Sequence, residues 1–203
     1  MLRKTLVAFA LGTLMLPGTA SADGASAQTS RSDVRRMITD EVVEGAWAIL
    51  TTGDAGAAAT LHTGGLEPGS AYTLWWVVFN HPDQCLGPHA GLRCGPPDLF
   101  NPHVDASLLW AAGAVAGSTG EATFESQLAQ GDNAGAFVMP GMKDPSPGLT
   151  QPHTAEIHLV VRNHGPARQE YLEEQTTTMN GGCDVGQPNF PCKDEQYAAF
   201  TRS

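Results

Sequence analysis

The run A-Y-T-L-W-W-V-V-F-N at residues 71–80 constrains the fold more than any other part of the chain. Its β-branched and aromatic residues are typical of a β-strand. Successive side chains of a strand point to opposite faces, so Tyr72 and its alternate neighbours would enter the core, and Trp75 and Phe79 would lie on the other face. Because large exposed apolar patches are uncommon on monomers, we expect a loop or a second sheet to cover that face. The alternative is a patch on which Trp75 and Phe79 contact a ligand.

Shorter segments with β character surround this run. Strands are predicted at residues 46–51, 57–63, 107–116, 121–129 and 155–162. The turn G-S-T-G at 117–120 suggests that the two strands beside it form a hairpin. Residues 81–106 and 139–153 are dense in proline and glycine, so long loops are expected there, and residues 171–179 are ambiguous.

A turn ahead of the central run has a more specific pattern. Residues 66–72 read L-E-P-G-S-A-Y, which resembles the tyrosine corner of immunoglobulin-like sandwiches, where the Tyr hydroxyl bonds back to the turn backbone. A simple hairpin turn is the alternative. We expect an all-β, Ig-like β-sandwich of seven or eight strands with two disulfide-clipped loops.

The cysteines form two close pairs in the sequence. Eight residues separate Cys85 from Cys94, and eight separate Cys183 from Cys192. In an oxidising compartment this spacing favours two local disulfides, Cys85–Cys94 and Cys183–Cys192, among three possible connectivities. Structural zinc sites usually hold ligands two to four residues apart, so a four-cysteine zinc site is disfavoured.

The N-terminus has the features of an export signal. Arg3 and Lys4 precede an apolar run, and Ala20-Ser21-Ala22 provides small residues for cleavage after Ala22. We therefore expect a signal peptide at 1–22 and a secreted or periplasmic protein. Residues 23–44 are expected to be a flexible lead-in, although a short helix or a strand up to residue 43 stays open. Residues 45–203 would form a single β-sandwich domain.

The charge balance excludes one class of partner. Of the 11 basic residues two lie in the predicted signal peptide, so nine remain against 21 acidic residues, and the formal net charge falls from –10 to –12. Such an acidic chain repels phosphate backbones, and we expect no nucleic-acid partner. No later segment is long and apolar enough to predict a membrane span.

Several motifs resemble those of a family of uncharacterised secreted bacterial proteins. They are W-W-V-V-F-N-H-P-x-x-C at 75–85, C-G-P-P-D-L-F-N-P at 94–102, A-E-I-H-L-V-V-R-N-H-G-P at 155–166 and N-G-G-C at 180–183. The resemblance covers most of residues 57–192. It implies export and one Ig-like or fibronectin-like β-sandwich, and it brings no activity and no catalytic residue.

Histidine is the candidate metal ligand. His81, His89 and His103 lie in or beside the loop that Cys85–Cys94 would close, and His158 lies in a predicted strand. Imidazoles held in this way could bind Cu or Zn. No H-x-H or H-E-x-x-H pair places two ligands on one element, however, so no cofactor is the first expectation.

The predicted strand 155–162 has one polar face. Glu156, His158 and Arg162 would stand in a row, with neighbouring i and i+2 positions about 7 Å apart. A solvated or cross-strand-paired polar face is the ordinary explanation of such alternation. The alternative is a row of contacts for a polar ligand.

No sequence motif points to an enzyme. The chain contains no G-x-S-x-G elbow, no phosphate-binding loop, no C-x-x-C pair and no dinucleotide-binding glycine pattern. We therefore predict a secreted, non-enzymatic binding module whose ligand, whether a protein, a small molecule or a carbohydrate, stays open. The alternative function is a Cu- or Zn-binding extracytoplasmic protein that uses the loop and strand histidines.

Overall fold

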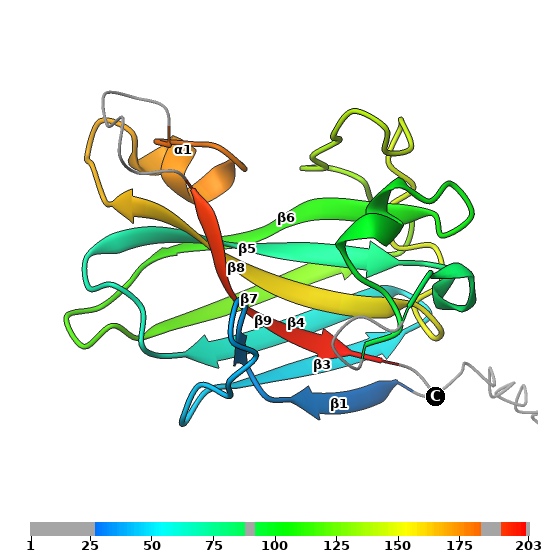
Figure 1. Ribbon diagram of the computed structural model, residues 1–203, viewed down its shortest axis with the longest axis horizontal. Coiled ribbons are helices and arrows are strands. Elements are labelled where there is room, and N and C mark those ends of the chain that lie inside the picture. The colour runs from blue at the N-terminus through cyan, green and yellow to red at the C-terminus, as the bar shows by residue number, and fades with distance from the viewer. Residues whose placement is uncertain (1–26, 88–91, 184–191, 202–203) are drawn as a thin grey trace, which may run out of the picture.

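The computed structural model describes residues 27–87, 92–183 and 192–201 as a mostly β structure of two antiparallel sheets (Figure 1). The predicted signal peptide and His89 lie outside the described residues. One sheet has the order β1-β3-β4-β7 and the other the order β2-β9-β8-β5-β6. The strands are β1 Gln28–Ser32, β2 Arg35–Arg36, β3 Trp47–Gly53, β4 Gly56–Thr63, β5 Ser70–Phe79, β6 Ala106–Val115, β7 Ala122–Ala129, β8 Glu156–Pro166 and β9 Lys193–Phe200. The helical elements are η1 Pro82–Gln84, η2 Pro96–Phe100 and α1 Leu172–Thr177.

The main core lies between the two sheets. In β3 and β4 every second residue is buried, which is the pattern of strands with one face towards a core. Leu50, Leu61 and Phe124 of the four-stranded sheet share one buried cluster with Leu74 and Trp76 of the five-stranded sheet. The two sheets therefore pack face to face as a two-layer β structure.

The central strand β5 is buried along its whole length. It lies between β8 and β6, and its inward side chains belong to the main core. Trp75 and Phe79 are only 2 % and 1 % exposed and pack in a second cluster with Val104, Leu108 and Met142. The prediction that this outer face is covered is confirmed.

The cover comes from long segments at both ends of the sheet. In Figure 1 the segments that follow β5 and β7 lie at one end, and α1 lies at the other. Asn80 binds the covering segments at the end where β5 stops. Its Nδ2 donates to the carbonyl oxygens of Asp105 (2.7 Å) and Gly148 (2.9 Å). Its Oδ1 accepts hydrogen bonds from the backbone N–H groups of Thr150 and Gln151. One buried amide thus joins two covering loops to the end of β5.

The structure has nine strands where seven or eight were expected. All six predicted strands are present within a few residues of their expected bounds. The described part of the expected lead-in at 23–44 contains two strands, since β1 pairs with β3 and β2 pairs with β9, in line with the strand alternative that the sequence left open. β9 escaped prediction because its first three residues, Lys193, Asp194 and Glu195, are charged and only its second half enters the core.

The predicted hairpin between residues 107–116 and 121–129 is also wrong. β6 pairs with β5 in one sheet, whereas β7 pairs with β4 in the other. Leu109 of β6 and Phe124 of β7 still face the same core. Two strands bury their apolar faces in this core whether they pair as a hairpin or lie in opposite sheets. The alternation of apolar and polar residues is the same in both arrangements, so it could not distinguish them.

The turn before β5 is held as the sequence predicted. The backbone N–H of Glu67 donates to the Tyr72 hydroxyl at 2.9 Å, and Asn163 Nδ2 donates to the same oxygen at 3.0 Å. The hydroxyl itself donates to Glu195 at 3.3 Å. Burial raises the pKa of Tyr72, and the neighbouring Glu195 carboxylate raises it further. The hydroxyl therefore stays protonated and joins the turn, β8 and β9.

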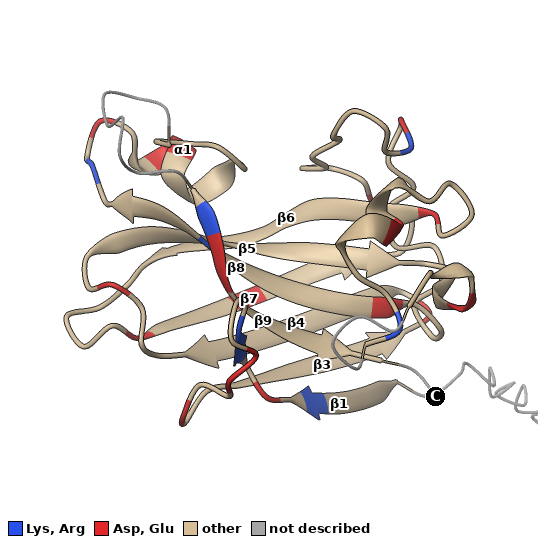
Figure 2. Ribbon diagram, viewed as in Figure 1, with Lys and Arg blue, Asp and Glu red and all other residues tan. Residues whose placement is uncertain are grey.

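The neighbouring strands β5 and β6 of the five-stranded sheet carry no charged residue. Figure 2 shows the ribbons of β5 and β6 without a single Lys, Arg, Asp or Glu, and their sequences agree. None of the helices in the described part of the chain has both the length and the apolar character that a membrane crossing requires.

Replacing Tyr72 by Phe should destabilise the protein by about 1–3 kcal/mol, because the ring packing is kept while the Glu67 N–H loses its acceptor and Asn163 and Glu195 each lose one hydrogen bond. Chemical denaturation measures the change. Tyr171→Phe is the matched control, since within the described residues the Tyr171 hydroxyl makes no hydrogen bond, and it should change stability by no more than about 0.5 kcal/mol. Equal effects of the two substitutions would contradict the assigned role of Tyr72.

Candidate ligand-binding cavity

A cavity of about 790 Å³ lies on the outer face of the five-stranded sheet. Ligand pockets of proteins usually measure about 300–1,000 Å³ and have mainly apolar walls with a few polar groups. Most of the residues that line this cavity are apolar. They include Met37, Ile38, Trp75, Val77, Phe79, Leu92, Leu99, Phe100, Leu108, Phe137, Met139, Val160, Met179 and Tyr197.

The cavity floor is the outer face of β5, β6, β8 and β9. Trp75, Phe79, His158 and Arg162, four of the five predicted ligand contacts, line the cavity. Glu156, the fifth, lies directly beside His158 and is 1 % exposed. Alternation along two neighbouring strands therefore brings the aromatic face of β5 and the polar row of β8 to one site.

One wall is the loop that the first disulfide closes. Cys85 and Cys94 are joined, as predicted, with their Cα atoms 5.2 Å apart. Both carboxylate oxygens of Asp98 accept backbone N–H groups of this loop, from Leu86 at 2.7 Å and from Gly95 at 2.8 Å. Asp98 thereby joins the chain on both sides of the disulfide, next to Pro96 and Leu99, which line the cavity.

A buried carboxylate and imidazole lie between this wall and the floor. Glu156 Oε1 accepts the backbone N–H of Cys94 at 3.0 Å and lies 2.7 Å from His158 Nε2. The His158 ring packs edge-on against Phe79, with ring centroids 5.2 Å apart. Because Nε2 is bonded to Glu156, the ring is fixed in orientation, and no described residue hydrogen-bonds its Nδ1. His158 Nδ1 is thus a buried polar atom in a residue that lines the cavity, and it has no hydrogen-bond partner among the described residues.

The second wall is held by Arg162. Its Nε donates to the carbonyl oxygen of Met179 at 2.9 Å, and its Nη1 donates to Asp194 at 2.6 Å. The first bond ties the segment after α1 to the sheet, and the second ties β8 to β9. Glu156 and Arg162 therefore act in this structure as anchors of the two covering segments, a role that the alternation of the strand does not reveal.

The rim of the cavity is unusually apolar. Six large hydrophobic residues of the described chain are exposed, and three of them line this cavity. These are Met37 at 36 % exposure, Ile38 at 93 % and Phe100 at 46 %. Exposed apolar residues gathered at a rim are typical of a site that accepts an apolar group.

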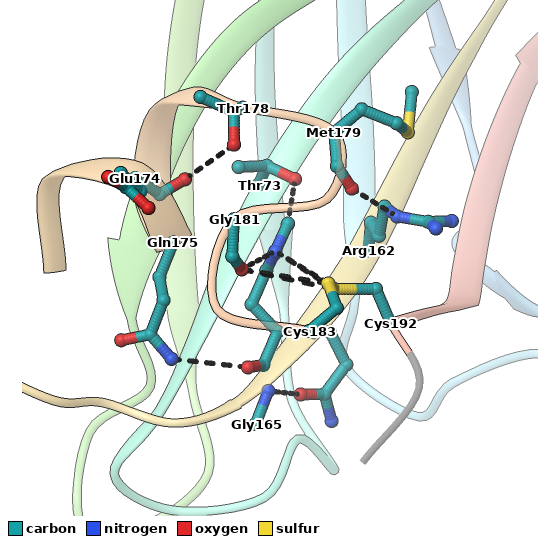
Figure 3. Close-up of a disulfide and its surroundings, with 12 residues drawn as sticks. Thr73, Arg162, Gly165, Glu174, Gln175, Thr178, Met179, Gly181, Cys183 and Cys192 are labelled. Atoms are coloured by element: carbon teal, nitrogen blue, oxygen red, sulfur yellow. Dashed lines mark hydrogen bonds between the residues drawn. A yellow bond between two sulfur atoms is a disulfide. The ribbon is translucent and has the colours of Figure 1, made fainter. Parts of the chain in front are cut away.

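A second buried group surrounds the other disulfide. His164 lies beside Cys183 and Cys192, which are joined as predicted with Cα atoms 5.3 Å apart. Figure 3 shows Thr73, Gly181 and both cysteines gathered at one point. His164 Nδ1 lies 2.9 Å from the Gly181 carbonyl oxygen, which can only accept, so Nδ1 carries the hydrogen. His164 Nε2 therefore accepts from the Thr73 hydroxyl, 2.8 Å away.

This hydrogen-bond chain continues to the cavity. The Trp75 indole N–H donates to Thr73 Oγ1 at 2.7 Å, and Trp75 is part of the cavity floor. Burial lowers the pKa of His164 below its usual 6.5. The bond to Gly181 opposes this with a smaller raising effect, and the lowering effect of Arg162 and the raising effect of Asp194 are smaller still. His164 is therefore neutral in the folded protein at pH 7.

The three predicted metal-binding histidines that lie in the described part of the chain do not form a common ligand group. His81 is paired loosely with Asp105 at 3.9 Å, His103 is exposed, and His158 is buried beside Glu156. Within the described residues, none of these three belongs to a group of three possible ligands. His164 was missed, because it follows the clear part of the strand and only the return of the chain at Cys183 brings sulfur near it.

Comparison with known proteins adds no relative. Neither a protein-family model, nor a curated protein, nor a solved structure matches the chain. The resemblance to a secreted bacterial family stays a prediction, and the function has to be argued from the geometry of the site.

Acid should destabilise the disulfide-bonded protein through His164. Its lowered pKa means that the folded state binds the proton less tightly than the unfolded state, so this group contributes stability above about pH 6.5 that is lost as the pH falls. Replacement by Gln should therefore flatten the dependence of the unfolding free energy on pH between about pH 7 and pH 5.

Thr73→Val is the control for this measurement. It disturbs the same site but keeps the imidazole, so it should retain the loss of stability in acid. Denaturation at a series of pH values distinguishes the two variants, and a His164→Gln protein that keeps the wild-type dependence would contradict the assignment.

Proposed function

We propose that the protein is an extracytoplasmic binding protein that holds a small, mostly apolar molecule in the cavity on the outer face of the five-stranded sheet. The observation that carries this proposal is a cavity of about 790 Å³ with apolar walls and an exposed apolar rim. A protein gains nothing in stability from such a space, because close packing of the same side chains would bury more apolar area. A ligand that fills the space provides the missing contacts.

The polar groups of the cavity limit the chemistry of the ligand. Arg162 is paired with Asp194, and Asp40 is bonded to both Arg35 and Tyr197. A charged ligand would have to break one of these pairs, so an uncharged ligand fits better. The Nδ1 atom of His158 accepts a hydrogen bond in the neutral ring and donates one in the charged ring. A hydroxyl group can meet either state, and we infer an apolar ligand with one hydroxyl.

We also propose that the two sheets have an Ig-like arrangement and that the protein is exported from the cytoplasm. The bond from Glu67 to Tyr72 supports an Ig-like arrangement of the two sheets. Two disulfides fit an oxidising compartment outside the cytoplasm and support export through the predicted signal peptide at 1–22. Membership of a secreted bacterial family fits both features.

Filling the cavity should abolish binding. Val160 is half-buried on the cavity floor, so Val160→Trp places an indole in the space that the ligand would use. The neutral fluorescent probe N-phenyl-1-naphthylamine should bind the wild-type protein and bind the variant at least about tenfold more weakly. The matched control is Ile49→Trp, which adds the same ring to the outer face of the other sheet and should bind like the wild type. No binding by the wild type, or equal loss in both variants, would refute the proposed site.

The inferred hydroxyl can be tested by competition. 2-Naphthol and naphthalene differ by a single hydroxyl, and each can displace the fluorescent probe. A net hydrogen bond of about 0.5–1.5 kcal/mol corresponds to roughly two- to tenfold tighter binding of 2-naphthol. His158→Phe should remove this preference while naphthalene still binds. If the wild type binds both compounds equally, the cavity proposal survives and the assignment of His158 fails.

A further inference from the structure

The group around the second disulfide has the geometry of a metal site. His164 Nδ1 lies 3.2 Å from Cys192 Sγ and 3.9 Å from Cys183 Sγ. The Gly181 carbonyl oxygen is 2.9 Å from the same nitrogen, 3.6 Å from Cys183 Sγ and 3.9 Å from Cys192 Sγ. One nitrogen, two sulfurs and one oxygen thus surround a common point, as Figure 3 shows for the labelled cysteines and Gly181.

These separations match those of a coordinated cation. Metal–sulfur bonds of about 2.3 Å and metal–nitrogen bonds of about 2.0 Å at a tetrahedral angle place nitrogen and sulfur roughly 3.5 Å apart. The observed distances of 3.2 and 3.9 Å lie on either side of that value. The two sulfurs would need to separate to roughly 3.8 Å, which requires cleavage of the bond between them and rotation of the two side chains.

The surroundings hold the imidazole in place. His164 is 1 % exposed, and its Nε2 lies 2.8 Å from the Thr73 hydroxyl. With a cation at Nδ1, the Nε2–H would donate to this hydroxyl oxygen, which is the arrangement that orients metal-binding histidines. Gly181 approaches the backbone of Glu174 so closely that a Cβ there would collide with its carbonyl oxygen. The turn that brings Cys183 to His164 therefore requires glycine.

We propose that reduction of the Cys183–Cys192 disulfide creates a binding site for a thiophilic d¹⁰ cation, Cu(I) or Zn(II), with Cys183, Cys192 and His164 as ligands. A dithiol supplies two electrons and two protons, so it becomes a disulfide while Cys183 and Cys192 become thiols. The cation then displaces both thiol protons to solvent. It also takes the place of the hydrogen at His164 Nδ1, and the ring carries its one hydrogen at Nε2 instead, so that it stays a neutral imidazole. Soft thiolate and imidazole ligands select such cations over Mg²⁺ and Ca²⁺.

The first disulfide provides an internal comparison. Cys85 and Cys94 also lie near a third possible ligand, Asp98. Both oxygens of that carboxylate already accept backbone N–H groups, at 2.7 and 2.8 Å. A cation at this pair would have to break the hydrogen bonds that shape the cavity wall, so the proposal assigns metal binding to the second disulfide alone.

The test uses the full chain without a histidine tag. Oxidised protein and protein reduced with a phosphine are titrated anaerobically with Zn²⁺, and separately with Cu(I), against a chromophoric chelator. We expect the reduced wild type to bind one equivalent and the oxidised protein to bind none. X-ray absorption of the loaded protein should show two sulfur ligands and at least one nitrogen.

Two double variants separate the pairs of cysteines. Cys183→Ser with Cys192→Ser should lose the bound metal, whereas Cys85→Ser with Cys94→Ser should retain one equivalent. His164→Gln should weaken binding at least about tenfold, and circular dichroism establishes that each variant is folded. If a variant does not fold, the X-ray absorption spectrum of the metal-loaded, reduced wild type identifies the ligands instead. A reduced wild type that binds no metal, or a first shell of sulfur alone, would overturn the proposal.

Discussion

Burial of β5 on both faces is the constraint on which the rest of the structure depends. Its inward side chains need the second sheet, and its outward side chains, with Trp75 and Phe79 among them, need a further layer. Each of these aromatic rings buries on the order of 150–250 Å², so leaving that face in water would cost several kcal/mol. The loops after β5 and β7 and the segment after α1 provide this layer.

A layer made of loops needs polar anchors, because it has few backbone hydrogen bonds of its own. Asn80, Glu156 and Arg162 provide them, and each binds backbone groups of a covering segment. Buried polar groups are stabilising only when they are bonded, and these three meet that condition. The cover is therefore held at these three anchors, and the cavity is the space that remains between the covering segments and the outer face of the sheet.

The two proposed sites share one hydrogen-bond chain. Trp75 of the cavity floor donates to Thr73, which bonds His164 beside the second disulfide. Two neighbouring outward side chains of β5 thus belong to the two proposed sites. Trp75 lines the apolar cavity, and Thr73 bonds the imidazole that lies next to the two sulfurs. Met179 and Asn180, at the edge of the cavity, come only a few residues before Cys183. A change at the disulfide would act on the segment that forms the second wall.

The sequence by itself determined the β class, six of the strands, both disulfide pairings, the turn at Tyr72 and the need to cover Trp75. Each follows from local physics: alternation along a strand, the short spacing of the cysteines, and a tyrosine five residues after its backbone donor. Tertiary structure alone decided that β6 and β7 belong to different sheets, that β9 completes one of them, and that His164 lies beside Cys192. Those outcomes depend on contacts between residues far apart in the chain, and many pairings of amphipathic strands satisfy the same alternation, so only their simultaneous packing selects one.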